Sequence, residues 1–109
     1  LKPRQKRYLK KGGINTALLD DIKTALRING TDFDDELQDL IDAAKADLVL
    51  SGVHKDKTDD KDPLIKRAII VYCKAHYGYD DMGERFAASY EGLKQHLTLS
   101  AEYTVGDTS

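Results

Sequence analysis

The side chains most able to do chemistry in this sequence are a group of aspartates, three histidines and one cysteine. The aspartates lie in a polar segment, with a spacing that invites comparison with calcium-binding loops: Asp56, Asp59, Asp60 and Asp62. A calcium loop of the EF-hand type also needs a glycine at its turn and a glutamate at its end, and both are missing. We therefore expect a solvated loop here and no metal site.

The histidines and the cysteine do not form a catalytic or metal-binding motif. His54, His76 and His96 lie far apart, without paired cysteines or HExxH spacing, so only the fold could assemble them. Cys73 lies in an apolar stretch, where a thiol is more often a small apolar filler than a nucleophile. No serine nucleophile elbow or phosphate-binding glycine loop is present. The sequence predicts no enzyme, no catalytic residue and no cofactor.

Apolar residues recur at helical spacing in four segments, which predicts an all-α protein. We expect a small bundle whose helices lie at about residues 16–28, 34–51, 63–77 and 83–99. The third helix has the clearest start, because Asp62 can accept hydrogen bonds from free amide groups and Pro63 has no amide hydrogen to satisfy. Its apolar residues cover more than one face, so we expect it to lie centrally.

A chain of 109 residues is the length of one domain. We expect a single helical domain at residues 14–100, between a basic N-terminal arm (1–13) and a C-terminal tail (101–109). The arm, the tail and the loop at 54–62 contain too few apolar residues to offset the entropy of ordering, so we expect them to be flexible. No apolar run approaches the ~20 residues of a membrane span, so we expect no membrane partner.

Charge is distributed unevenly, although the net charge is only -2. The arm has six basic residues and no acidic one: Lys2, Arg4, Lys6, Arg7, Lys10 and Lys11. Residues 14–53 have nine acidic residues and three basic ones. Clustered basic residues can bind nucleic acid by neutralising phosphates, whereas an acidic surface repels DNA.

Some apolar residues fall outside the main apolar stripes of the second and third helices. A bundle of four helices should not be able to cover all of them, so we expect them at the contact between subunits: Val49, Leu50, Val53, Ile70 and Val71. The sequence leaves open the alternative that short helices pack irregularly and bury these residues against the tail or the first helix.

The third and fourth helices resemble the head-tail connectors of tailed phages, a family of small helical adaptor or head-completion proteins also described as DNA-packaging proteins. The motifs that carry the resemblance are DPLIKRAII (62–70), YCKAHYGY (72–79), ERF (84–86), SYEGLK (89–94) and LTLS (97–100). The first two helices, with the paired Asp20 and Asp21, are similar to the opening of the family. The resemblance covers about residues 15–103 and excludes the arm, which we expect to be a native extension or a remnant of cloning.

The resemblance implies an adaptor that docks under the portal after genome packaging, repeats in a twelve-fold ring and carries the next stopper or tail-completion protein. It implies a place at the head-tail junction of the virion after synthesis in the cytoplasm of the bacterial host, and no catalysis. Packaged DNA would pass through the ring without specific binding.

Two groups of residues are candidates for roles in such a ring. Four carboxylates are candidates to face the lumen and repel DNA: Asp35, Glu36, Asp39 and Asp42. The six basic arm residues, with Tyr103 and Val105, are candidates to contact the portal or another partner. The segment at 103–105 has the composition to add to a partner as a strand.

A small viral DNA-binding or packaging module that uses the basic arm is the main alternative function. Its affinity for DNA would fall steeply as salt rises and would be lost on deletion of residues 1–13. A metal-dependent hydrolase built on the aspartates is a third possibility, which metal-dependent stabilisation would support.

Overall fold

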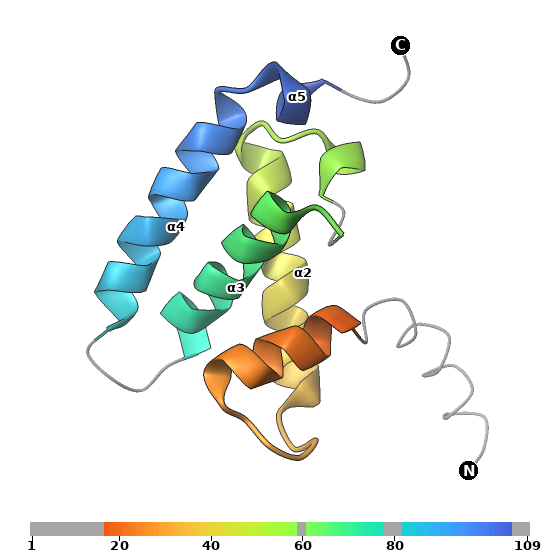
Figure 1. Ribbon diagram of the computed structural model, residues 1–109, viewed down its shortest axis with the longest axis vertical. Coiled ribbons are helices and arrows are strands. Elements are labelled where there is room, and N and C mark those ends of the chain that lie inside the picture. The colour runs from red at the N-terminus through yellow and green to blue at the C-terminus, as the bar shows by residue number, and fades with distance from the viewer. Residues whose placement is uncertain (1–16, 59–60, 78–81, 106–109) are drawn as a thin grey trace, which may run out of the picture.

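The computed structural model describes residues 17–58, 61–77 and 82–105, and every regular element in these ranges is helical. A first helix at residues 17–26 is followed by α2 (Asp34–Ser51), the short 3-10 helix η1 (Lys55–Lys57), α3 (Pro63–Tyr77), α4 (Gly83–Thr98) and α5 (Ala101–Thr104) (Figure 1). The prediction of an all-α bundle is confirmed, and each of the four predicted helices is present. The short helix α5 was not predicted.

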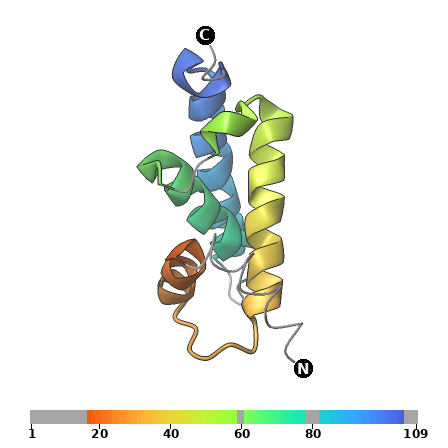
Figure 2. The ribbon, with the colours of Figure 1, turned by 90° about the vertical axis from the view of Figure 1, so that its right-hand side faces the viewer.

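Helix α3 lies between α2 and α4 and runs antiparallel to both of them (Figure 1). The helix at residues 17–26 crosses the lower part of the bundle. It is joined to α2 by the ion pair of Lys23 with Asp34 (2.8 Å) and to α3 by that of Lys66 with Asp21 (2.7 Å). The molecule is flat, with extents of 46 × 41 × 19 Å, and Figure 2 shows α2 on one side of it and α3 with the first helix on the other.

The core is made of apolar side chains from each long helix. On α2 the buried residues recur three or four positions apart, as the sequence pattern predicts: Leu37, Ile41, Ala44 and Leu48. On α3 they cover several faces: Ile65, Ala68, Ile69, Val71 and Cys73. This distribution fits the position of α3 between two neighbours, because a helix that is contacted on several sides has no single apolar stripe.

Helix α2 ends in a tight turn at Gly52, whose φ of 124° lies in the region that favours glycine. The amide of Gly52 donates to the carbonyl of Val49, and the amide of Val53 donates to that of Leu48 (3.1 and 3.0 Å). This turn satisfies the free carbonyl groups at the end of the helix and directs the side chain of Val53 back into the core. Val53 is only 1% exposed, although it falls outside the apolar stripe of α2.

Helix α3 begins as the sequence predicted. One carboxylate oxygen of Asp62 accepts hydrogen bonds from the amides of Leu64 (2.9 Å) and Ile65 (3.3 Å), and Pro63 occupies the first helical position. The same carboxylate also accepts a hydrogen bond from the hydroxyl of Tyr103 on α5 (3.1 Å). Asp62 therefore stabilises the start of α3 and anchors the C-terminal helix.

The structure adds a short helix to the loop and corrects the expectation for the tail. Residues 55–57 of the loop form η1, and the amide of His54 donates to the carbonyl of Tyr103 (2.8 Å); residues 59–60 lie outside the described ranges. The tail was expected to contain too little apolar surface to pack, but Tyr103 is buried. One large aromatic ring, with two hydrogen bonds to fix it, is enough to hold this short helix on the bundle.

Replacing Asp62 with alanine is expected to lower the free energy of unfolding by about 2 kcal/mol. The α3 cap is worth about 1 kcal/mol, and the Tyr103 hydroxyl loses its acceptor at the same time. Urea denaturation followed by circular dichroism measures the change. Asp62→Asn keeps an acceptor at the cap and should cost less, and equal losses in the two variants would contradict this account of the cap.

Candidate functional site

The residues expected at a subunit contact separate into exposed and buried groups. Val49 and Leu50, at the end of α2, are 42% and 86% exposed and remain available to a partner. Val53 and Val71 are buried in the core, and Ile70 packs against the core while half-buried. For Val53 and Val71 the interface prediction is corrected, and the alternative of packing within the chain describes them better. For the half-buried Ile70 it stays a prediction.

The residues expected to contact the portal or another partner also fall into different settings. Tyr103 is buried within the bundle, so its assignment as a partner contact is corrected, and the segment at 103–105 is not a free strand. Val105 is exposed. The basic residues of the arm, Lys2 to Lys11, lie outside the described part of the chain.

Leu99 is an exposed apolar residue that the sequence interpretation missed. It is 80% exposed and follows the end of α4. It lies near the exposed end of α2, because a Cβ built on Gly52 would be in van der Waals contact with Thr98 (3.6 Å). The sequence did contain a signal for the exposure of Leu99, because this residue lies two positions past the buried Leu97 and falls outside the apolar stripe of α4.

The four carboxylates expected to face a lumen are exposed on α2. They lie at the acidic end of that helix, and none forms an ion pair with any residue the structure describes: Asp35, Glu36, Asp39 and Asp42. Asp42 accepts a hydrogen bond from Gln38 on the same helix (3.1 Å). The described part of the chain thus leaves these four carboxylates without an ionic partner.

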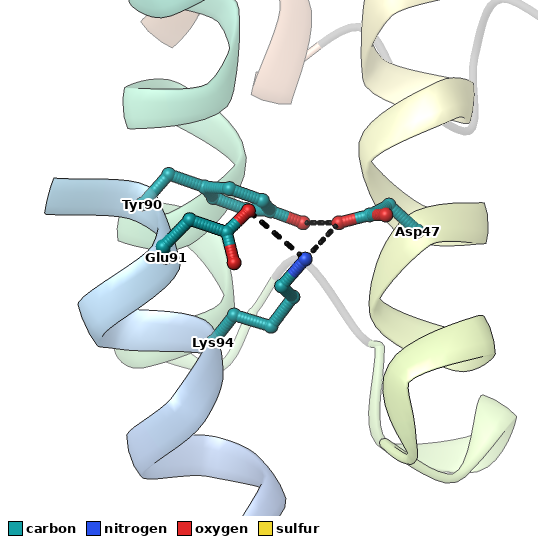
Figure 3. Close-up of polar contacts among 4 residues, drawn as sticks. All are labelled: Asp47, Tyr90, Glu91 and Lys94. Atoms are coloured by element: carbon teal, nitrogen blue, oxygen red, sulfur yellow. Dashed lines mark hydrogen bonds and ion pairs between the residues drawn. The ribbon is translucent and has the colours of Figure 1, made fainter. Parts of the chain in front are cut away.

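A polar cluster links α2 to α4 (Figure 3). The carboxylate of Asp47 on α2 accepts hydrogen bonds from the hydroxyl of Tyr90 (2.5 Å) and from the ammonium group of Lys94 (3.0 Å). Lys94 also pairs with Glu91 (3.1 Å), and the ring of Tyr90 packs edge-to-face on Tyr72 of α3. The cluster therefore fixes three helices relative to one another.

The charges in this cluster stabilise each other. Burial opposes ionisation of Asp47, but the hydrogen bonds from Tyr90 and Lys94 outweigh it and lower the pKa of the carboxyl group. Burial likewise opposes the charge of Lys94, but its hydrogen bonds to Asp47 and Glu91 raise the pKa of the ammonium group. Burial and the bond to Asp47 raise the pKa of the Tyr90 hydroxyl, which stays neutral and donates. This is the arrangement of a structural tie between helices.

The residues considered for catalysis or metal binding are not brought together. Within the described ranges, no three histidine, cysteine, aspartate or glutamate side chains are placed to hold a metal ion. Cys73 is buried, and burial raises the pKa of its thiol to about 12, which suppresses the thiolate needed for nucleophilic attack. No helix in the described part of the chain is both long and apolar enough to cross a membrane.

A comparison with protein-family models matches the phage connector protein family over residues 18–104. The chain belongs to this family. Searches of curated proteins and of solved structures found no match. A phage connector protein is a structural component of the virion that contacts other head or tail proteins. The exposed surfaces of this connector protein are therefore the features that matter for its function.

Replacing Asp47 with asparagine is expected to lower the stability of this connector protein at neutral pH by about 1 kcal/mol, since the cluster is partly open to solvent. The loss should shrink as the solution becomes acidic. A carboxyl group with a lowered pKa stabilises the fold above its unfolded pKa, and this contribution is lost as pH falls through the folded pKa.

Unfolding measured between about pH 7 and about pH 2 tests this dependence. The wild-type chain should lose more stability on acidification than Asp47→Asn does. Asp42→Asn is the matched control, because Asp42 lies on the same helix but outside the cluster. If Asp42→Asn reduced the acid sensitivity as much as Asp47→Asn, the cluster would not be its source.

Proposed function

We propose that this protein is a head-tail connector that forms a ring under the portal of a tailed phage, closes the DNA-filled head and carries the next connector or tail component. The observation that carries this proposal is the family match over residues 18–104, which covers nearly all of the described helices. The proposed copy number is twelve, as in the connector rings that the sequence resembles. The protein would act by contact alone, at the head-tail junction of the virion.

Exposed apolar residues at one end of the bundle support a role in assembly. Leu50 and Leu99 are each at least 80% exposed, at the ends of neighbouring helices. Removing a leucine side chain from water is worth about 1.5–3 kcal/mol, so a partner that covers both gains a substantial driving force. Isolated exposed leucines are common on protein surfaces, but their placement at one end favours a contact there.

We assign contact with the portal or with the downstream protein to the basic arm and to Val105. The arm has six basic residues, which would suit an acidic surface on a neighbouring protein. Val105 is exposed at the C-terminal end of the described chain. The portal, the stopper or tail-completion protein and further copies of this chain are thus the proposed partners, and packaged DNA passes through without specific binding.

Adding the chain to portal-bearing particles that lack it tests the proposal directly. Electron microscopy should show a new ring of density below the portal vertex, and no comparable density at other sites on the head. Binding to free DNA is measured alongside, over a series of salt concentrations. Absence of the ring, together with DNA binding that weakens steeply with salt, would favour the DNA-binding module instead.

Leu50→Asp is expected to weaken ring formation and leave the monomer folded, because the side chain is 86% exposed. The matched control is Val53→Asp, three residues further along, where the side chain is 1% exposed and a buried charge should unfold the chain. Circular dichroism measures helix content, and electron microscopy measures the ring on particles. A Leu50→Asp chain that forms rings as readily as the wild type would exclude Leu50 from the contact.

A further inference from the structure

We propose that copies of this chain dock head to tail, with the outer face of α2 on one copy lying against the outward face of α3 and the start of α4 on the next. This inference rests on the proposed function, in which the protein repeats around an axis, and it names the two surfaces that meet. It concerns surfaces that are exposed or half-buried in the single chain and lie on different helices.

The outer face of α2 has two halves of different character. Residues three or four positions apart lie opposite the buried stripe of this helix: Asp35, Asp39, Asp42, Ala46 and Val49. All five are exposed, and Glu36 and Leu50 flank them. The half near the start of the helix is therefore acidic, and the half near its end is apolar.

The outward face of α3 and the start of α4 carry three basic residues, beside one exposed acidic residue, Glu84, in the first turn of α4. Arg67 and Lys74 are seven residues apart, so they lie on the same side of α3, with the exposed Leu64 before them. Arg67 is exposed and Lys74 is half-buried, and their long side chains flank the buried Val71.

The ammonium group of Lys74 lies 5.2 Å from the ring centre of Phe86, so Lys74 reaches the start of α4, where the preceding residue, Arg85, is exposed. Arg67, Lys74 and Arg85 form no ion pair with any described residue. We call these four residues, including Leu64, the basic face.

The two faces have the same order along the molecule. Because α2 and α3 are antiparallel, the acidic start of α2 lies at the same end of the bundle as Lys74 and Arg85 (Figure 1). The apolar end of α2, with Leu50, lies at the opposite end of the bundle. Helix α3 begins toward that same end, with Leu64 in its first turn. A copy shifted sideways without being turned over would thus set acids against bases and leucine against leucine.

The placement of the two faces permits this contact. Figure 2 shows α2 on one side of the flat molecule and α3 on the other, so one copy can use both faces at once. A contact between two different patches of the same chain is heterologous, and it generates a closed ring when the rotation between copies closes. A second copy is the occupant that the structure favours, because the complementary surface is present on the chain itself. On this view the α2 carboxylates contact a neighbouring subunit, instead of facing a DNA-filled lumen.

Two charge-reversal variants of the full chain test the proposal. Asp39→Lys combined with Asp42→Lys changes only the outer face of α2, and Arg67→Glu combined with Arg85→Glu changes only the basic face. Each variant alone is expected to self-associate at least about tenfold more weakly than the wild type, because like charges then meet across the contact. Mixed together, the two variants should associate again as alternating copies, because the reversed α2 face of one is complementary to the reversed basic face of the other and their unchanged faces still match.

Sedimentation velocity at high protein concentration measures the association, which should weaken in the wild type as salt rises. Asp20→Lys combined with Asp32→Lys is the matched control, because these exposed aspartates lie outside both faces and should leave association unchanged. Circular dichroism checks that every variant keeps its helices.

Three results would overturn the proposal: a wild-type chain that stays monomeric at every concentration, variants that associate as the wild type does, or a mixture that does not restore association. If the variants associate as the wild type does, the α2 carboxylates face a lumen or solvent instead of a neighbouring subunit. The particle experiment separates these outcomes from the proposed function. If the wild-type chain still adds a ring below the portal, only the choice of docking faces is wrong; if it adds none, the connector role is wrong.

Discussion

The packing of α3 between α2 and α4 is the constraint on which the rest of the structure depends. Neighbouring elements contact α3 on several sides and bury most of its apolar residues. The part of α3 that stays exposed is a narrow outward stripe that includes Arg67. The neighbouring helices then have one inner face each, and their outer faces are left to solvent or to partners. The polar cluster around Asp47 adds a direct tie between α2 and α4, which would otherwise meet mainly through α3. The surfaces proposed for assembly thus follow from the way the core is formed.

Local signals in the sequence predicted the four long helices and their ends with good accuracy. The start of α3 is the clearest example, because capping by Asp62 and the position of Pro63 depend on residues adjacent in the chain. The end of α2 at Gly52 is another, since the left-handed turn needs a residue type that the sequence displays. Where the physical cause is local, the sequence is sufficient. The family resemblance rests on the same helices, and the family match confirms it.

Contacts between distant parts of the chain were less predictable. Val53 and Val71 were expected at a subunit contact because they fall outside simple apolar stripes, but a turn and a central helix bury them. Tyr103 was expected to be free, yet its hydroxyl reaches a residue 41 positions earlier in the chain. Pairings such as that of Asp47 with Tyr90 depend on how helices cross, and helical periodicity carries no information about that. The sequence therefore predicted exposure correctly only at residues such as Leu50, where it is set locally, and the role of Leu50 in a subunit contact stays a prediction.

The burial of Cys73 has a practical consequence for studying this protein. Its thiol lies in the core with a pKa raised to about 12, so reagents that attack thiolates should react with it slowly while the chain is folded. A cysteine introduced at a solvent-facing position would then be the one fast-reacting thiol among the described residues. Fluorescent probes or cross-linkers can be attached at the introduced cysteine without replacing Cys73, so the packing of α3 stays intact. Such probes can then map which proteins lie next to this chain in a particle.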